Sequence, residues 1–87
     1  MRIDKYLKVA RILKKRTVAK ALADNGRLLI GTRPIKASYE VKIGDEITII
    51  FGHRNFKIKV LDVKENASKQ DALSMYEVIE ETINEGL

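Results

Sequence analysis

Residues 3–15 repeat apolar and cationic side chains with the period of an α-helix. At about 100° per residue, one side of such a helix carries the apolar residues Ile3, Tyr6, Leu7, Val9, Ala10 and Leu13. The other side carries Lys5, Lys8, Arg11 and Lys15, together with Asp4. Asp4 is expected to pair with Lys8, one turn later. The pattern predicts a helix with one side in a core and a cationic strip in solvent.

A second, shorter helix is expected directly after the first. Thr17 is a suitable N-cap, and Asn25 followed by Gly26 is typical of a helix end. The residues between these ends are rich in alanine, whose small side chain lets a backbone approach its neighbour closely. The two-residue link Lys15-Arg16 then makes a tight, basic corner between the helices.

The middle of the chain changes to the shorter pattern of β-strands. Residues 27–30 and 33–36 flank Gly31-Thr32, where a glycine at the first loop position favours a type II′ hairpin. Pro34 has no N–H to donate, so its strand is expected at an edge of the sheet. Longer strands are predicted at 46–51 and 56–63, joined by residues 52–55. The side chains expected to face inward are Phe56, Ile58, Val60 and either Leu61 or Val63.

The C-terminal segment is expected to form a third helix. Ser68, with Asp71 three residues later, resembles a capping box at its start. An apolar stripe at helical spacing would follow, made of Ala72, Met75, Tyr76, Ile79 and Ile83. The opposite side would be acidic through Glu77, Glu80, Glu81 and Glu85. Such a stripe usually faces a core, and a surface for a protein partner is the alternative.

Length and composition limit the fold class. The 87 residues suffice for one domain and include no cysteine, which excludes disulfides and thiolate metal sites. No stretch approaches the ~20 apolar residues that span a bilayer, and the N-terminus lacks the apolar run of a signal peptide. We therefore expect a cytoplasmic, monomeric α+β domain over residues 1–87 without a cofactor. Its two N-terminal helices would pack on a small, mostly antiparallel sheet, with extra strands and a C-terminal helix.

Positive charge is concentrated in one part of the chain. Residues 1–36 hold eleven Lys or Arg against two acidic residues, whereas residues 37–87 hold six against ten. If the net charge of +5 were spread evenly over the chain, it would indicate little more than a soluble protein. Concentrated in one segment, it creates a directed field and predicts a polyanionic partner for that segment.

Several short motifs match a known family of RNA-binding domains. The matching runs are Arg2-Ile3-Asp4-Lys5-Tyr6-Leu7, Arg11, Lys15-Arg16-Thr17-Val18-Ala19, Gly26-Arg27-Leu28 and Val41-Lys42-Ile43-Gly44-Asp45. In this order they resemble the S4 RNA-binding domain, with its αL motif, over residues 1–48. Residues 49–87 would then be a strand and helix extension. The chain departs from the family pattern in having Gly31-Thr32 at the hairpin tip and Lys15-Arg16 at the helix corner.

The candidate site follows from charge and helix geometry as well as from the motifs. Unpaired amides and the dipole at the start of the second helix favour a phosphate, and Arg16 lies immediately before the expected cap. Arginine binds phosphate bidentately and stacks on exposed bases, which suits structured RNA. The predicted RNA-binding residues are Arg2, Lys5, Lys8, Arg11, Lys15, Arg16, Thr17, Lys20 and Arg27.

A stand-alone S4-like domain with this extension is similar to the ribosome-associated factors of the RqcP and heat-shock-protein-fifteen type. The resemblance is nearer to the RqcP branch. It implies binding to large-subunit rRNA and P-site tRNA on stalled large subunits, while the partner RqcH directs C-terminal alanine tailing. A heat-shock-type role in recycling free large subunits, and a generic structured-RNA-binding module, are the alternatives.

Two other function classes compete with RNA binding. Catalysis is not expected, because His53 is the only histidine and lies in a polar turn without a second catalytic group or a glycine-rich phosphate loop. DNA binding by a helix-turn-helix would require base-reading side chains on the second helix, and its alanines offer few. The cations instead gather on the first helix and at the corner, which favours recognition of backbone and shape.

Overall fold

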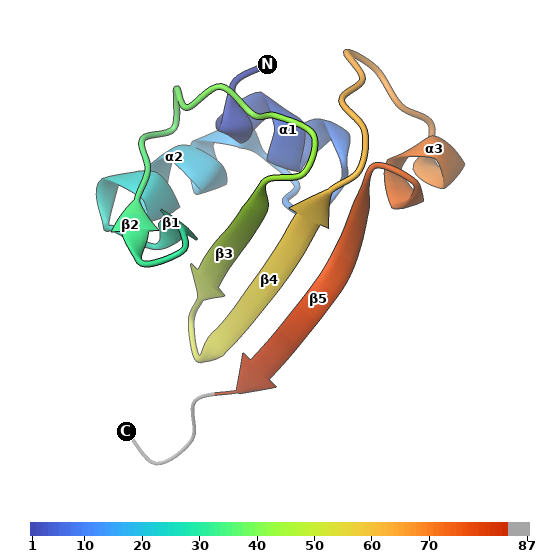
Figure 1. Ribbon diagram of the computed structural model, residues 1–87. Helices are drawn as coiled ribbons and strands as arrows, with labels where there is room; N and C mark the ends of the chain where they lie inside the picture. Colours follow the sequence, from blue (N-terminus) through green and yellow to red (C-terminus); the bar gives the residue numbers. More distant parts are fainter. Residues whose placement is uncertain (84–87) are drawn as a thin grey trace.

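The computed structural model describes residues 1–83 and forms an α+β fold in which the helices gather at one end of a sheet (Figure 1). Its elements are α1 (Ile3–Val9), α2 (Arg16–Asp24), β1 (Leu28–Ile30), β2 (Arg33–Pro34), β3 (Glu46–Phe51), β4 (Arg54–Val60), α3 (Lys69–Leu73) and β5 (Tyr76–Ile83). The strands form one antiparallel sheet in the order β2-β1-β3-β4-β5. Two N-terminal helices on an antiparallel sheet are the predicted architecture, which is confirmed. No helix within the described residues is long and apolar enough to cross a membrane.

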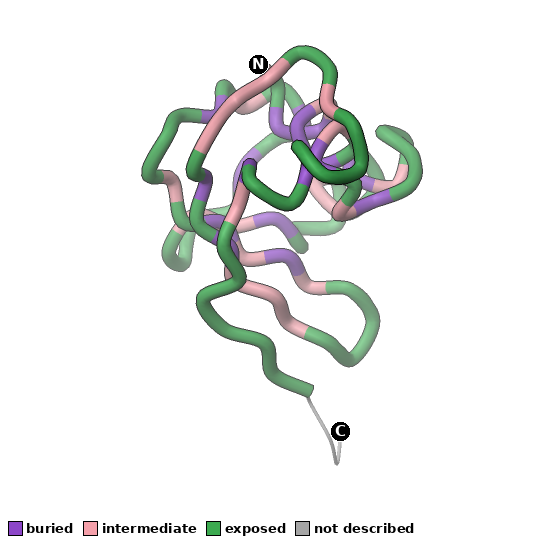
Figure 2. Tube along the Cα trace, turned by 90° about the vertical axis from the view of Figure 1, so that its right-hand side faces the viewer, coloured by how far each residue is buried: buried purple, intermediate pink, exposed green. Residues whose placement is uncertain are grey.

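The core lies between the two N-terminal helices and the near end of the sheet. Helix α1 contributes Ile3, Tyr6 and Leu7, all fully buried as its periodicity predicts. The sheet contributes alternate residues, because successive side chains of a strand point to opposite faces. The buried residues, purple in Figure 2, thus lie near the helices and in the adjoining part of the sheet, and the far ends of β4 and β5 extend past the helices.

Helix α1 is shorter than its periodicity predicts, and the expected extent to Lys15 is wrong. The amide of Ile12 donates to the carbonyl of Leu7 at 3.0 Å, and the amide of Arg11 donates to that of Lys8 at 3.0 Å. Together these bonds form a Schellman cap, whose central residue must be left-handed. Arg11 takes that conformation, with φ of 59°, where glycine is usual. Residues 10–14 form a turn.

The strand predictions are confirmed in position, with shifted ends. Strand β2 is one of the two edge strands of the sheet, and Pro34 lies on it opposite Leu29. Strand β3 spans the predicted residues, whereas β4 begins two residues earlier than expected and stops at Val60. Ile58 and Val60 are buried, Phe56 and Val63 are half-buried, and Leu61 is exposed.

The prediction of a long C-terminal helix is wrong, because most of this segment is a strand. Ser68 does cap a helix, accepting a bond from the amide of Asp71 at 3.1 Å, but α3 ends at Leu73. Strand β5 follows and pairs with β4, and its acidic residues meet cations across the pair: Lys59 lies opposite Glu77 and Lys57 opposite Glu80. Such pairs and β-branched residues stabilise a strand. Glu85 lies outside the described residues.

Candidate nucleic-acid interface

A buried carboxylate joins the starts of α1 and α2. The side chain of Asp4 is 6% exposed and lies between two arginines. Its Oδ2 is 3.2 Å from Nη2 of Arg2, and its Oδ1 is 3.2 Å from Nη2 of Arg16. The amide of Lys5 also donates to Oδ1, at 2.7 Å. The expected pairing of Asp4 with Lys8 on the outer side of the helix is therefore wrong.

The two arginines remain available to a ligand. Their side chains are 50% exposed at Arg2 and 45% exposed at Arg16. Each uses one nitrogen on Asp4, and a guanidinium has five N–H donors in a planar fork. One negative charge against two positive ones leaves this cluster cationic. The carboxylate thus orients two guanidinium groups without neutralising both of their charges.

Lys5 also has a partner, but outside the Asp4 cluster. Its ammonium pairs with the carboxylate of Glu65 in the loop after β4. This hydrogen bond and the charge of Lys5 lower the pKa of Glu65. Lys5 is half-buried beneath that loop, so binding a phosphate would mean exchanging one exposed ion pair for another.

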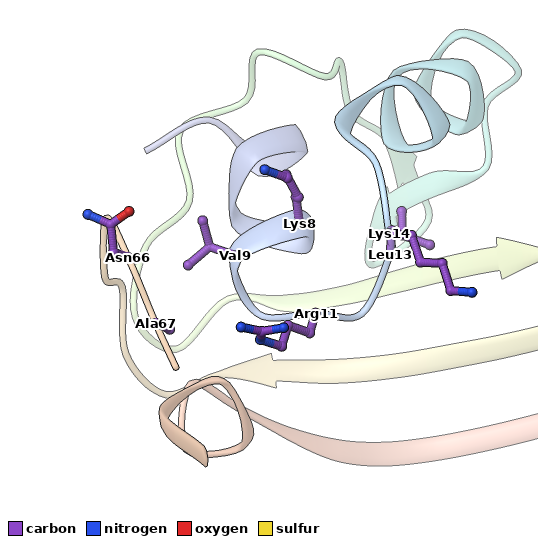
Figure 3. A pocket seen from close by; sticks show the side chains of 7 residues that line it. All are labelled: Lys8, Val9, Arg11, Leu13, Lys14, Asn66 and Ala67. Atoms are coloured by element: carbon purple, nitrogen blue, oxygen red, sulfur yellow. The ribbon is translucent and has the colours of Figure 1, made fainter. Parts of the chain in front are cut away.

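A basic hollow of about 400 Å³ lies beside the end of α1. Figure 3 shows Lys8 projecting from α1, and Arg11 and Lys14 from the turn that follows it, with Asn66 and Ala67 on the facing loop. Lys8 and Arg11 were expected here. Lys14 was missed because a helix continuing to Lys15 would have placed it off the cationic strip; the turn brings it to the hollow instead.

The start of α2 carries the rest of the predicted residues. Lys15 is the N-cap and Arg16 the first helical residue, so the expected cap at Thr17 is wrong. No side chain caps this helix start, which leaves room for an anion at its first turn. Lys15, Thr17 and Lys20 are exposed. Arg27 is exposed after α2 and lines a shallow hollow with Thr17.

The arrangement suits binding of a polyanion. The exposed cations lie on two helices and the turn between them, an arrangement that suits contact with the backbone of a folded nucleic acid. Among residues 1–83, no three His, Asp or Glu side chains come together to hold a metal ion. His53 is exposed in the turn between β3 and β4.

Comparison with known proteins identifies relatives of this chain and structures with the same fold. The S4 domain family model matches residues 1–47. The RQC P-site tRNA stabilizing factor of Streptococcus pneumoniae (strain R6) is 49% identical over 82 residues, covering 94% of this chain and 93% of that protein. The factor of the same name from Bacillus subtilis (strain 168) is 44% identical over 81 residues, covering 93% and 94%. The solved trimeric structure of Vibrio cholerae heat shock protein 15 has a TM-score of 0.81 at 28% identity, covering 90% of this chain and 80% of that one.

These matches agree with the resemblance seen in the motifs. The S4 model covers α1, α2, β1, β2 and the start of β3, which is the part of the chain where the cations gather. The likeness to the stabilizing factors continues far beyond residue 47, through the extension. The chain belongs to the S4 domain family and, within it, to the RQC P-site tRNA stabilizing factors.

Proposed function

We propose that this protein is a non-enzymatic factor that binds large-subunit rRNA and P-site tRNA during ribosome-associated quality control. The observation that carries the proposal is the Arg2–Asp4–Arg16 cluster, in which a buried carboxylate holds two half-exposed guanidinium groups at one corner. Arginines oriented before binding lose less side-chain freedom when they meet phosphates. The protein would act in the cytoplasm, associated with ribosomes.

The RNA-binding surface would consist of the exposed cations around this cluster. Lys8 and Arg11 would extend it along the end of α1, and Lys14 joins them in the same hollow. Lys15, Thr17, Lys20 and Arg27 would extend it along α2. Lys5 would contribute only after releasing Glu65.

The tRNA and the quality-control role are supported by the relatives. Proteins that share 44% to 49% identity over nearly the whole chain are named for stabilising a P-site tRNA. By this likeness, the protein would hold the peptidyl-tRNA on a stalled large subunit while RqcH directs alanine tailing of the nascent chain.

Binding to large ribosomal subunits that carry a P-site tRNA tests the proposal. If about six cations meet phosphates, the logarithm of affinity should fall with that of salt at a slope of about −4 to −5. Arg16→Ala should weaken binding and make the slope shallower by about 0.7 to 0.9. Lys42→Ala removes the same charge from an exposed site outside the surface and should change neither quantity by much. A wild-type protein that fails to sediment with these subunits, even at low salt, would refute the proposal.

A recycling role on free large subunits is the second candidate, favoured by the fold similarity to heat shock protein 15. The two roles predict that different partners are bound to the same large subunit. Large subunits captured through this protein should contain RqcH and tRNA if it acts in tailing. They should lack RqcH if it acts in recycling.

A further inference from the structure

Phe51 is an exposed aromatic residue at the end of β3. Its residue surface is 47% exposed, although the alternating pattern of β3 places it on the same face as the buried Ile47 and Ile49. Helix α2 lies beside this end of the sheet and lines a shallow hollow with Phe51, but no described residue covers the ring fully. An aromatic ring left half in water at a defined position suits a ligand with a flat apolar face.

The ring lies between two neighbouring hollows. The first is lined by Thr17 and Arg27, which belong to the proposed RNA-binding surface. The second is lined by Arg11, Arg54 and other residues of the sheet and the turn after α1. Phe51 lines both, so it lies where the cationic surface meets the far end of the sheet.

Arginines from three separate segments thus line the hollows around this ring. Arg11 comes from the turn after α1, Arg27 from the segment before β1, and Arg54 is the register partner of Phe51 on β4. The guanidinium of Arg54 stacks on the ring of Phe56 at 4.6 Å and pairs with the carboxylate of Glu81. Among the described residues, none that lines either hollow is acidic.

This combination favours a nucleobase over an apolar peptide. Unpaired bases in RNA are recognised by stacking on aromatic rings and on guanidinium planes, while nearby cations hold the flanking phosphates. An apolar peptide would use the aromatic rings but would have to desolvate the arginines without compensation. Continuity with the cationic surface at Thr17 and Arg27 places this ring within reach of the same RNA.

We propose that Phe51 stacks on an unpaired nucleobase of the RNA held by the cationic surface, with Arg11 and Arg27 on the flanking backbone. The inference rests on the proposed function and adds a base contact from outside the region that the S4 model matches. It predicts that the protein prefers an RNA site with a looped-out or bulged base to a fully paired helix.

Binding to large subunits carrying a P-site tRNA tests the stacking through the salt dependence. Phe51→Leu keeps apolar volume but removes the ring, and it should weaken binding by roughly 5- to 150-fold with an unchanged salt slope. Phe51→Tyr should bind like the wild type. Ile43→Ala, at another exposed apolar residue, should have little effect. Thermal melts of all variants would establish that they are folded.

Ultraviolet cross-linking identifies the contacted molecule. Tryptic residues 43–54 contain Phe51 and should carry a nucleotide adduct that Phe51→Leu abolishes. Weaker binding of Phe51→Leu without any adduct in the wild type would separate the effect of the ring from contact with a base and overturn the inference. Wild-type binding by Phe51→Leu beside weakened binding by Arg16→Ala would overturn the inference and leave the proposed function standing. If the wild-type protein did not bind large subunits at all, both the stacking inference and the proposed function would be refuted.

Discussion

The guanidinium of Arg16, at the start of α2, lies 3.2 Å from the buried carboxylate of Asp4 in α1. The same carboxylate holds Arg2 at 3.2 Å on its other oxygen. Twelve positions separate Asp4 from Arg16 in the chain, so this contact exists only when the two helices are packed. Folding and the orientation of two proposed RNA-binding groups are therefore coupled through one acidic side chain.

Asp4→Asn should lower RNA affinity although it makes the protein more positive. The amide keeps the size of the side chain but loses the charge that orients both arginines. Because those arginines are half-exposed and can be hydrated, we expect the free energy of unfolding to fall by about 1–3 kcal/mol. Affinity for large subunits, measured by co-sedimentation, should fall with it.

Asp24→Asn provides the matched control, since it makes the same charge change at an exposed position on α2. It should leave affinity unchanged or raise it slightly, as expected for a simple gain in positive charge. If Asp4→Asn also raised affinity, the carboxylate would not be orienting the arginines, and net charge alone would govern binding.

The end of α1 shows what periodicity can and cannot predict. The positions of Tyr6 and Leu7 in the core follow directly from the apolar period, and both are fully buried. The helix end does not follow, because Leu13 and Lys15 continue the apolar and cationic sides of the helical pattern and no glycine marks the cap. An arginine in the left-handed position gives no signal of this kind in the sequence.

The last strand shows a second limit. Residues 76–83 have apolar positions that suit a helix as well as a strand, and short segments of this kind cannot be assigned by period alone. The decisive interactions are with β4, where Lys57 and Lys59 face Glu80 and Glu77. Those pairings depend on strand register, which a pattern within one segment does not contain.

The sequence identified candidate residues for the site, but it did not predict how they are arranged around one another. Charge concentration and motifs singled out Arg2 and Arg16. Their shared contact with Asp4 is tertiary and was not predicted. Lys14 was missed, since its place depends on the turn after α1. Phe51 lies at the predicted end of β3, but its exposure was not predicted, since it depends on how far α2 and the turn after α1 cover the sheet.

Leu7→Ala should destabilise the protein without altering the cationic surface directly. Leu7 is fully buried in α1, and truncating it leaves a cavity that the surrounding core fills only in part. We expect the free energy of unfolding, measured by urea titration, to fall by about 2–5 kcal/mol. Leu73→Ala makes the same change at a residue that is 71% exposed and should cost far less. Equal losses at both positions would contradict the packing described for α1.

Tyr6→Phe should make the protein less sensitive to alkaline pH. The Tyr6 hydroxyl donates to the carbonyl of Met75 at 2.7 Å, and burial raises the pKa of Tyr6 above its ordinary value. The unfolded chain would lose this proton near pH ~10, while the folded protein keeps it. Stability from this group is therefore present below about pH 10 and is lost as the pH rises above that value.

Urea titrations between pH 8 and pH 11 would show this difference. At pH 8, Tyr6→Phe should be less stable by about 0.5–1.5 kcal/mol, because the hydrogen bond is lost. The gap between variant and wild type should then narrow as the pH rises. Curves that stay parallel would mean that the folded and unfolded states release the Tyr6 proton at the same pH.

Arg11→Gly should separate stability from binding. The left-handed backbone at Arg11 costs a residue with a side chain about 1–2 kcal/mol, and glycine adopts it without that cost. Glycine also adds freedom to the unfolded chain, worth about 0.4–1 kcal/mol in the opposite direction. We therefore expect the free energy of unfolding to stay the same or rise by up to about 1.5 kcal/mol. Affinity for large subunits should fall, with a salt slope shallower by about 0.7 to 0.9.

Lys14→Gly is the control for Arg11→Gly, since it removes a cation from the same turn at a residue without positive φ. It should weaken binding in a similar way but gain no stability, because no steric strain is relieved. If Arg11→Gly instead lost more than about 1 kcal/mol of stability, contacts of the guanidinium would be stabilising the turn. Arginine would then occupy this strained position for a structural reason. A stable variant that binds poorly would show that the strained position is occupied by arginine for its charge.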